Sequence, residues 1–423
     1  MPLWTAPSTP VIDRVRTAHK DNVGTEPAHI ASAPATWSLI GEHIDHYGGI
    51  AIMGLSDLRA AVGVSARHDG TVTVRCLSAD GSTTEDFITL DKISALAAEQ
   101  QPSVDSEGQP VEPPAPAGGL AARLGGIIHT MITRQLLSRE TAGADITVAT
   151  DIPDNAGLGA AAAIDIATAL ALLGSADDPH DAPLRARLAE VCSQAVGTFA
   201  HFPALRARHS AALRGTGESI TIIDYADGSV TQAPHPVNQD LAAYVIAVPG
   251  DFDCEDAIAD IRARERFVDD ACHAFGTESL RLLPDAPQRV LDWLAAVHKI
   301  HGPENQPTIP QATAWLTFYA EETDRAQGLA RALRSRRGTE LFPLLTQSQS
   351  ALATVYGFDS ADKLAQLATA RGAVAARSAH AGTSTAAIAY VPRAKATNFA
   401  ADLAEDGLLV VPLSAGAPAV TES

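Results

Sequence analysis

The sequence predicts a mixed α/β fold, and three observations support this class. Residues 71–76 alternate apolar and polar side chains and residues 146–150 are rich in β-branched ones, so both have the pattern of strands. Residues 120–137 carry an apolar stripe at helical spacing, as do several later segments. The length of 423 residues suits two domains with large cores, or one large domain.

The charge and the cysteine content of the sequence indicate which partners and which cellular compartment to expect. A net charge of −19, from 31 basic and 50 acidic residues, argues against nucleic-acid and anionic-membrane partners, which require a basic surface. It does not argue against a nucleotide in a pocket. The four cysteines form no CxxC pair, which fits a reducing cytoplasm. We find no signal-peptide pattern and no apolar run of membrane-spanning length, so we expect a cytoplasmic protein.

The N-terminal half begins with an expected amphipathic helix and loop over residues 11–28. A strand end opening into a polar loop follows at 37–49, and further strands are expected at 51–55, 60–66, 71–76 and 86–90. Residues 101–119 are rich in Pro, Glu and Gly and predict a solvated surface insertion. The helix at 120–137, the strand at 146–150 and an Ala-rich helix ending near Gly174 complete this half.

In the C-terminal half we expect helices at 184–200, 257–275, 288–300, 311–334 and 360–370. Strands are expected at 220–224, 242–249, 386–392 and 408–413, and a loop is expected to begin at 374–381.

The polar loop at 37–49 is the first candidate site. Glu42, His43 and Asp45 lie within four residues and are flanked by glycines, a density that suits hydrogen bonding to the hydroxyls of a small polar ligand. A polar turn that caps a core strand would have the same pattern. Metal ligation is a further option, but neighbouring residues on an extended segment point to opposite faces, so only two or three could reach one ion.

The second candidate site is the small-residue loop at 151–163, where a strand is followed by an Ala-rich helix. Gly157, Leu158 and Gly159 lead into Ala160, Ala161 and Ala162, and a helix N-terminus offers unsatisfied N–H donors to phosphate. The loop has neither the Walker A lysine nor the full GxGxxG pattern. Tight packing between a strand and a helix would also explain the small residues.

In chain order these stretches resemble the galactokinases of the GHMP kinase superfamily. LIGEHIDHYGG resembles the galactokinase signature, PDNAGLGAAAA the second, phosphate-binding motif, and residues 377–385 stand where the family has its third, glycine-rich motif. The resemblance spans about residues 11–417. It implies a two-domain GHMP kinase fold, with an N-terminal ribosomal-S5-domain-2-like domain (1–204, including the insertion at 101–119) and a C-terminal ferredoxin-like domain (205–423).

The resemblance also implies a cleft between the domains in which ATP and Mg²⁺ serve to phosphorylate the anomeric hydroxyl of a sugar. It assigns Glu42, His43 and Asp45 to the sugar. The stretch from Gly157 to Ala162 is assigned to the nucleotide phosphates.

The chain departs from the family at the positions that carry the chemistry. Thr36 stands where the family has an arginine, and Arg208 where it has the catalytic aspartate, with Leu205 in place of a glycine. Val196 falls on the Mg²⁺-binding glutamate and Ile261 on the tyrosine that closes over the sugar. The hydroxyl ligand to Mg²⁺ is replaced by alanine, and third-motif glycines by His380, Ser384 and Thr385. An alkyl group cannot bind a hard cation, and an arginine cannot act as a base, so we predict no metal ligands and no family catalytic residue.

Three functions follow as hypotheses. The first is a non-catalytic pseudokinase that binds a sugar, an anionic metabolite or a nucleotide, with Arg206, Arg208 and His209 as a candidate anion site because guanidinium groups bind anions bidentately. A salt bridge to Asp45 is the alternative role for this basic cluster. The second function is an active ATP- and Mg²⁺-dependent sugar 1-kinase with a displaced base, for which Glu42, Asp45 and Asp165 are the candidates. The third is a structural oligomer subunit with a plugged cleft.

Overall fold

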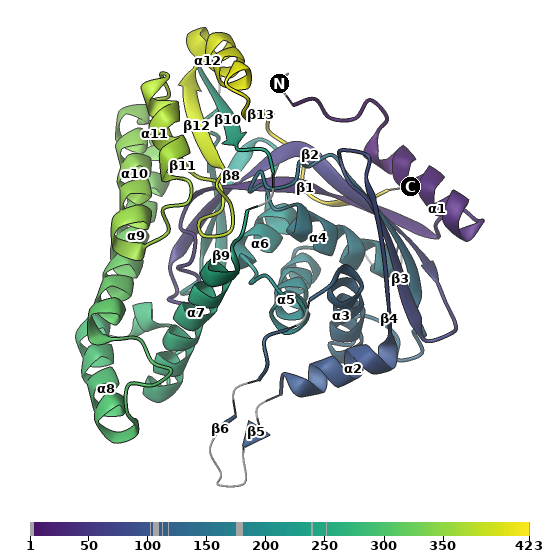
Figure 1. Ribbon diagram of the computed structural model, residues 1–423, viewed down its shortest axis with the longest axis horizontal. Helices are drawn as coiled ribbons and strands as arrows, with labels where there is room; N and C mark the ends of the chain where they lie inside the picture. The colour runs from purple at the N-terminus through teal and green to yellow at the C-terminus, as the bar shows by residue number, and fades with distance from the viewer. Residues whose placement is uncertain are drawn as a thin grey trace.

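The computed structural model describes residues 4–101, 103–104, 110–111, 113–116, 118–174, 181–237, 240–250 and 252–422. Two sheets dominate this part of the chain (Figure 1). None of its helices combines the length and the apolar character needed to cross a bilayer. The predicted insertion at 101–119 lies partly outside the described residues, and its described part forms a short hairpin from β5 (Ser103–Val104) and β6 (Pro110–Val111).

The large sheet has eight strands and the backbone order β14-β1-β2-β7-β3-β4, with β8 and β9 added beside β2. Its strands are β1 (His29–Ile40), β2 (Ile50–Ala66), β3 (Thr71–Leu77), β4 (Thr83–Thr89), β7 (Ala144–Thr150), β8 (Ser219–Asp224), β9 (Ser229–Pro234) and β14 (Val420–Glu422). Only the β3–β7 pair is parallel among the described strand pairs of this sheet. The strands β8, β9 and β14 lie beyond residue 204, so both predicted domains contribute to this sheet; the domain division itself stays a prediction.

The long strand β2 organises this sheet. Its first part pairs with β8 through Ile50–Met53, and its second part pairs with β7 through Ala60–Ala66. Our separate strands at 51–55 and 60–66 were therefore one strand. Polar Ser56 and Asp57 interrupt the apolar pattern, but Ser56 is buried and bridges to Ala415, so the backbone stays extended through the interruption.

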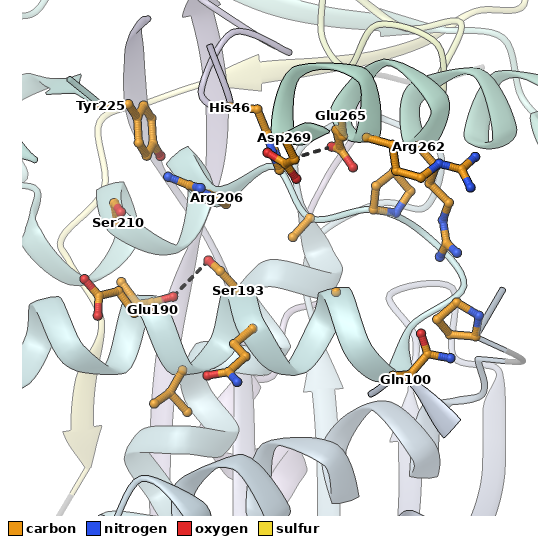
Figure 2. A pocket seen from close by; sticks show the side chains of 18 of the residues that line it. His46, Gln100, Glu190, Ser193, Arg206, Ser210, Tyr225, Arg262, Glu265 and Asp269 are labelled. Atoms are coloured by element: carbon orange, nitrogen blue, oxygen red, sulfur yellow. Dashed lines mark hydrogen bonds and ion pairs between the residues drawn. The ribbon is translucent and has the colours of Figure 1, made fainter. Parts of the chain in front are cut away.

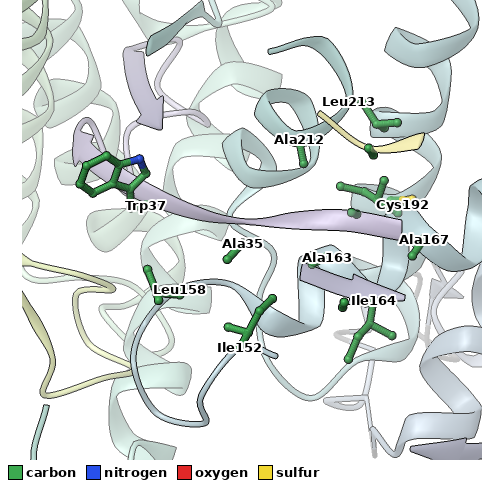
Figure 3. Close-up of a cluster of buried hydrophobic side chains, with 14 of the residues drawn as sticks. Ala35, Trp37, Ile152, Leu158, Ala163, Ile164, Ala167, Cys192, Ala212 and Leu213 are labelled. Atoms are coloured by element: carbon green, nitrogen blue, oxygen red, sulfur yellow. The ribbon is translucent and has the colours of Figure 1, made fainter. Parts of the chain in front are cut away.

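Helices cover both faces of the large sheet. These are α1 (Val11–Val23), α2 (Leu90–Glu99), α3 (Leu120–Thr133), α4 (Ala160–Leu173), α5 (Ala182–Phe199) and α6 (Arg206–Arg214). Helices α3 to α6 lie together on one side, and α1 packs on the other against β2 and β7 (Figure 1). Figure 3 shows the layer between β1 and α4, with Ala35 on β1, Leu158 in the loop before α4 and Ala163 on α4. Small alanines let α4 approach the strand closely and so place the loop before it.

The second sheet is antiparallel, with the order β11-β12-β10-β13, and carries α11 and α12 on one face. Its elements are β10 (Leu241–Ala247), β11 (Ala375–Ser378), β12 (Ala387–Pro392), β13 (Leu409–Leu413), α11 (Asp362–Ala370) and α12 (Arg393–Glu405). The loop that we expected at 374–381 is wrong over its first half, because Ala375–Ser378 pairs with Ala387–Tyr390 and is buried throughout.

A helical layer joins the two sheets along one side (Figure 1). It comprises α7 (Glu255–Phe275), α8 (Ala286–His301), α9 (Ile309–Arg334) and α10 (Gly338–Ala351). An aromatic cluster that includes Phe318, Tyr319 and Tyr356 holds it together. The loop after β1 inserts Ile44 and Tyr47 into this cluster. The polar loop of the first candidate site is thereby fixed between the large sheet and the helical layer.

Candidate active site

The carboxylates of the first candidate site are buried in ion pairs. Glu42 is fully buried, and Arg377 Nη1 donates to its Oε2 at 2.7 Å. Burial is the largest influence and alone would raise the pKa of Glu42, but the combined effect of Arg377 and the neighbouring His380, His43 and Arg208 exceeds it, and the pKa is lowered. Glu42 is therefore an ion-pair partner of the third motif. Asp45, at 7% exposure, has its Oδ2 3.4 Å from Arg206 Nε, which agrees with the salt-bridge alternative.

The side chain of His43 also contacts other parts of the protein. Its backbone has a φ of +63°, a conformation that few side chains other than glycine adopt, and its Nε2 lies 2.9 Å from the carbonyl oxygen of Ala381. Burial lowers the pKa of His43, so the ring is neutral at neutral pH. The ring lies against Tyr356 and Phe358 at centroid distances of 5.8 and 5.3 Å. The predicted sugar contacts thus lie close in sequence but turn toward different partners.

Arg208 occupies the point where the three motif segments meet. Its Nη1 donates to the carbonyl oxygen of Thr36 at 2.5 Å, and its Nη2 donates to those of Gly157 and Ala379 at 2.8 and 2.9 Å. The residue is 2% exposed. Burial lowers the pKa of Arg208 to about 10, so it remains a cation at neutral pH. The alignment with the family's base position thus puts a guanidinium at this junction.

The phosphate loop is packed against this guanidinium. Gly159 has a φ of +69°, and a Cβ on it would lie 2.8 Å from Arg208 Nη1 and 2.9 Å from Thr36 Oγ1. A Cβ on Gly157 would lie 2.7 Å from that of Ala379. The amide of Thr36 also donates to the carbonyl oxygen of Leu158. The glycines therefore permit close approach of the first and third motifs, as the packing alternative predicted. The face of α4 at Ala160 and Ala161 stays partly accessible.

The candidate positions for a displaced base are occupied by ion pairs. Asp165 is fully buried, and Arg123 donates to its two oxygens at 2.6 and 2.5 Å. His209 Nε2 lies 3.1 Å from Asp165, and its Nδ1 lies 2.9 Å from the hydroxyl of Ser193. The structure does not bring Arg206, Arg208 and His209 onto one ligand, because each has a separate set of partners. Their joint role as an anion site stays a prediction.

The residues around the phosphate loop do not fit Mg²⁺. Val196, which the resemblance places at the family's glutamate position, is a buried alkyl side chain on α5. No group of three or more His, Cys, Asp and Glu side chains that could hold a metal occurs among the residues that the structure describes. The nearest charge to Gly157 and Gly159 is the cationic Arg208, which would repel a divalent cation.

Sequence reasoning missed two groups. The first is the network below Glu42, in which Glu322 on α9 receives hydrogen bonds from Arg377 and Ser348. The second is on α7, where Asp269 and Glu265 lie 3.0 and 3.7 Å from the nitrogens of His46. The signal for Glu322 was available, since it stands on the apolar stripe of a helix between Tyr319 and Ala326. Figure 2 shows the second group at the edge of a cavity.

Comparisons with known proteins show what this chain is similar to. Residues 17–66 match the galactokinase galactose-binding signature. The galactokinase of Mycobacterium tuberculosis is 28% identical over 382 residues, which cover 87% of this chain and 90% of that protein. That of Streptomyces coelicolor is 30% identical over 182 residues, 43% of this chain and 40% of that protein.

Solved structures show the same fold. Lactococcus lactis galactokinase complexed with galactose matches with a TM-score of 0.69 and 15% identity, over 97% of this chain and 100% of that one. Methanococcus jannaschii mevalonate kinase matches with a TM-score of 0.57 and 14% identity, over 92% and 98%. These matches confirm the predicted fold class.

Proposed function

Because this chain is a divergent member of the galactokinase family with the GHMP kinase fold, we propose that it is a non-catalytic member, a pseudokinase that acts by binding. The observation that carries this proposal is the position of Arg208. A fixed cation donates to backbone carbonyls of all three motif segments at the place where a kinase needs a carboxylate. Phosphoryl transfer requires positioned metal and usually a base for the nucleophile, and Arg208 supplies neither.

The contacts of the remaining carboxylates support the same proposal. Glu42 is paired with Arg377, and Asp165 with Arg123 and His209. Recruiting either as a base would require breaking a buried ion pair, which costs about 3–5 kcal/mol. A general base contributes roughly 10²–10⁴-fold in rate, so its loss together with that of the metal ligands leaves little of the family activity.

A structural subunit with a plugged cleft is a second candidate, favoured by the same filled junction. The two candidates differ in ligand space. A cavity of about 1130 Å³ lies beside the junction, lined in part by His46 and Arg206. This volume favours a protein that binds a ligand, since a purely structural role gives no reason to keep it open.

The test is an ADP-release assay with ATP, Mg²⁺ and galactose, with the Mycobacterium tuberculosis galactokinase as positive control. We expect turnover at the enzyme-free background. Metal-dependent ADP release with any hexose would overturn the proposal. The variant Arg208→Asp supplies the missing carboxylate alone, and we expect it to stay inactive because the metal ligands are still absent. Activity in that variant would show that the arginine, and not the lost metal site, is the block.

A further inference from the structure

We propose that the large cavity between α5, α6 and α7, which lies beside the junction at Arg208, is a binding site for a phosphorylated small molecule. The cavity has a volume of about 1130 Å³ and lies between the facing helices α5 and α7 (Figure 2). Its described lining contains neither the phosphate loop nor Glu42, His43 or Arg208. This inference does not depend on whether the chain phosphorylates a sugar.

The first argument is the concentration of arginine. The whole chain has 31 basic against 50 acidic residues. The cavity lining reverses this ratio, with three acidic residues against six arginines, which are Arg134, Arg187, Arg206, Arg214, Arg262 and Arg266. Gathering like charges on a concave surface is electrostatically unfavourable without a counter-charge. A cavity with this lining focuses a positive potential that attracts anions.

The second argument is the way in which three of these arginines are held. Arg262 donates to the carbonyl oxygens of Ala200 and His201 at 3.0 and 2.8 Å. Arg134 donates to the side-chain oxygen of Gln194, and Arg187 to the carbonyl oxygen of Arg134. Neutral oxygens orient a guanidinium without cancelling its charge. Each group therefore keeps its charge for a ligand while its position is fixed in advance, which lowers the entropic cost of binding.

The third argument concerns the acidic residues of the lining. Asp269 and Glu265 lie against His46, and their contacts raise the pKa of its imidazole to about 9 despite burial. A protonated His46 balances part of their charge. Burial raises the pKa of Glu265 to about 7, so this carboxyl is only partly ionised at neutral pH. Two of the three acidic residues are thus largely compensated by His46, whereas Arg134, Arg187 and Arg262 donate to neutral oxygens.

The ligand class follows from charge and size. Guanidinium groups bind phosphate oxygens with paired hydrogen bonds, and several of them favour a ligand with more than one anionic oxygen. The volume is at the upper end for small-molecule sites and accommodates a sugar phosphate or a nucleotide. Pro113, Pro116 and Ile223 provide apolar wall for the uncharged part of such a molecule.

The test is calorimetric titration of the full chain, without magnesium, with galactose 1-phosphate, ADP and galactose. We expect one of the two phosphorylated ligands, or both, to bind with an affinity that falls as salt is added, and galactose not to bind. Binding of only one identifies the source of the phosphate. Absence of binding by both at millimolar concentration, or equal binding of galactose, would overturn the proposal.

Variants locate the site. Arg262→Gln on α7 and Arg134→Gln at the end of α3 come from different walls, and we expect each to weaken binding about tenfold. Arg371→Gln is the matched control, since Arg371 is a surface arginine paired with Asp406 outside the cavity lining. Circular dichroism verifies that each variant is folded. Unchanged affinity in both cavity variants would place the ligand elsewhere and contradict the inference.

Discussion

The guanidinium of Arg208 donates a hydrogen bond to the carbonyl oxygen of Thr36, 172 positions earlier in the chain, at 2.5 Å. The sequence resemblance places these two residues where galactokinases have an aspartate and an arginine. In this chain the cation is on the helix α6 and a hydroxyl residue is on the strand β1. The exchange leaves one positive charge at the junction and removes the negative charge. In this structure the contact holds two segments of the chain together.

Replacing Arg208 should therefore reduce stability. Arg208→Met leaves the carbonyl oxygens of Thr36, Gly157 and Ala379 without their buried donor, at a cost of about 1–3 kcal/mol. Urea unfolding measures the change. The control is Arg371→Met, which removes a surface ion pair with Asp406 whose side chains are 39% and 43% exposed, and the expected loss is below about 1 kcal/mol. Equal stability of the two variants would mean that Arg208 does not hold the segments together.

The sequence predicted most of the elements and the overall class, because helical and strand periodicities follow from burial on one face. The prediction failed where the secondary structure of a segment depends on pairing with residues far away in the sequence. Ala375–Ser378 is a strand only because Ala387–Tyr390 lies beside it. Likewise, the strand β1 begins at His29 in a run of small residues that carries no β-propensity signal of its own.

The candidate site shows the same limit. The alignment placed Arg208 at the catalytic position, and the structure locates it between Thr36 and Gly157. Nothing in the sequence indicated that Glu42 would pair with Arg377, which is 335 positions away. A carboxylate in a polar loop has the same pattern whether it faces a ligand or a buried cation, and only the tertiary contacts distinguish the two cases.

The pair of Glu42 and Arg377 gives the second prediction. Both side chains are at most 1% exposed and lie 2.7 Å apart. Arg377→Met should cost about 3–5 kcal/mol, because it leaves the buried carboxylate of Glu42 without its cation. Glu42→Gln should cost less, because Glu322 still lies 3.4 Å from Arg377, and the double variant should lose less than the sum. Unfolding by urea gives the three free energies.

A surface pair serves as the control for this cycle. Arg371 and Asp406 also lie 2.7 Å apart, but they are 39% and 43% exposed. Arg371→Met and Asp406→Asn should each cost under about 1 kcal/mol. If the losses in free energy of unfolding at Glu42 and Arg377 are additive, the two side chains do not stabilise each other, and Glu42 would be available to a ligand.

The third prediction concerns pH. Contacts with Asp269 and Glu265 raise the folded-state pKa of His46 from 6.5 to about 9 despite burial. The stabilisation from protonated His46 is then fully present below pH 6.5 and is lost as the pH rises through 9. Asp269 is 61% exposed, so solvent screening limits the contribution to roughly 1 kcal/mol.

The variant His46→Gln should remove that part of the pH dependence. Thermal unfolding from pH 6 to pH 10 measures it, with wild type losing stability between about pH 6.5 and pH 9 and the variant losing less. His201→Gln is the control, a surface histidine beside Glu255 on the N-terminal end of α7. A variant curve parallel to that of wild type would show that His46 is not protonated in the folded protein.

The last prediction tests the packing that positions the first motif. Gly54 pairs with Trp37 across β1 and β2, and a Cβ on Gly54 would lie 1.5 Å from the indole nitrogen of the fully buried Trp37. Gly54→Ala must displace the ring from its place against Tyr390, and overpacking of this kind costs about 1–3 kcal/mol. In contrast, Gly197 in α5 has open space around its Cβ position. Gly197→Ala should stabilise the chain by about 0.5–1 kcal/mol through helix propensity. Melting temperatures that fall for the first variant and rise for the second support the packing, and an unchanged melting temperature for Gly54→Ala would contradict it.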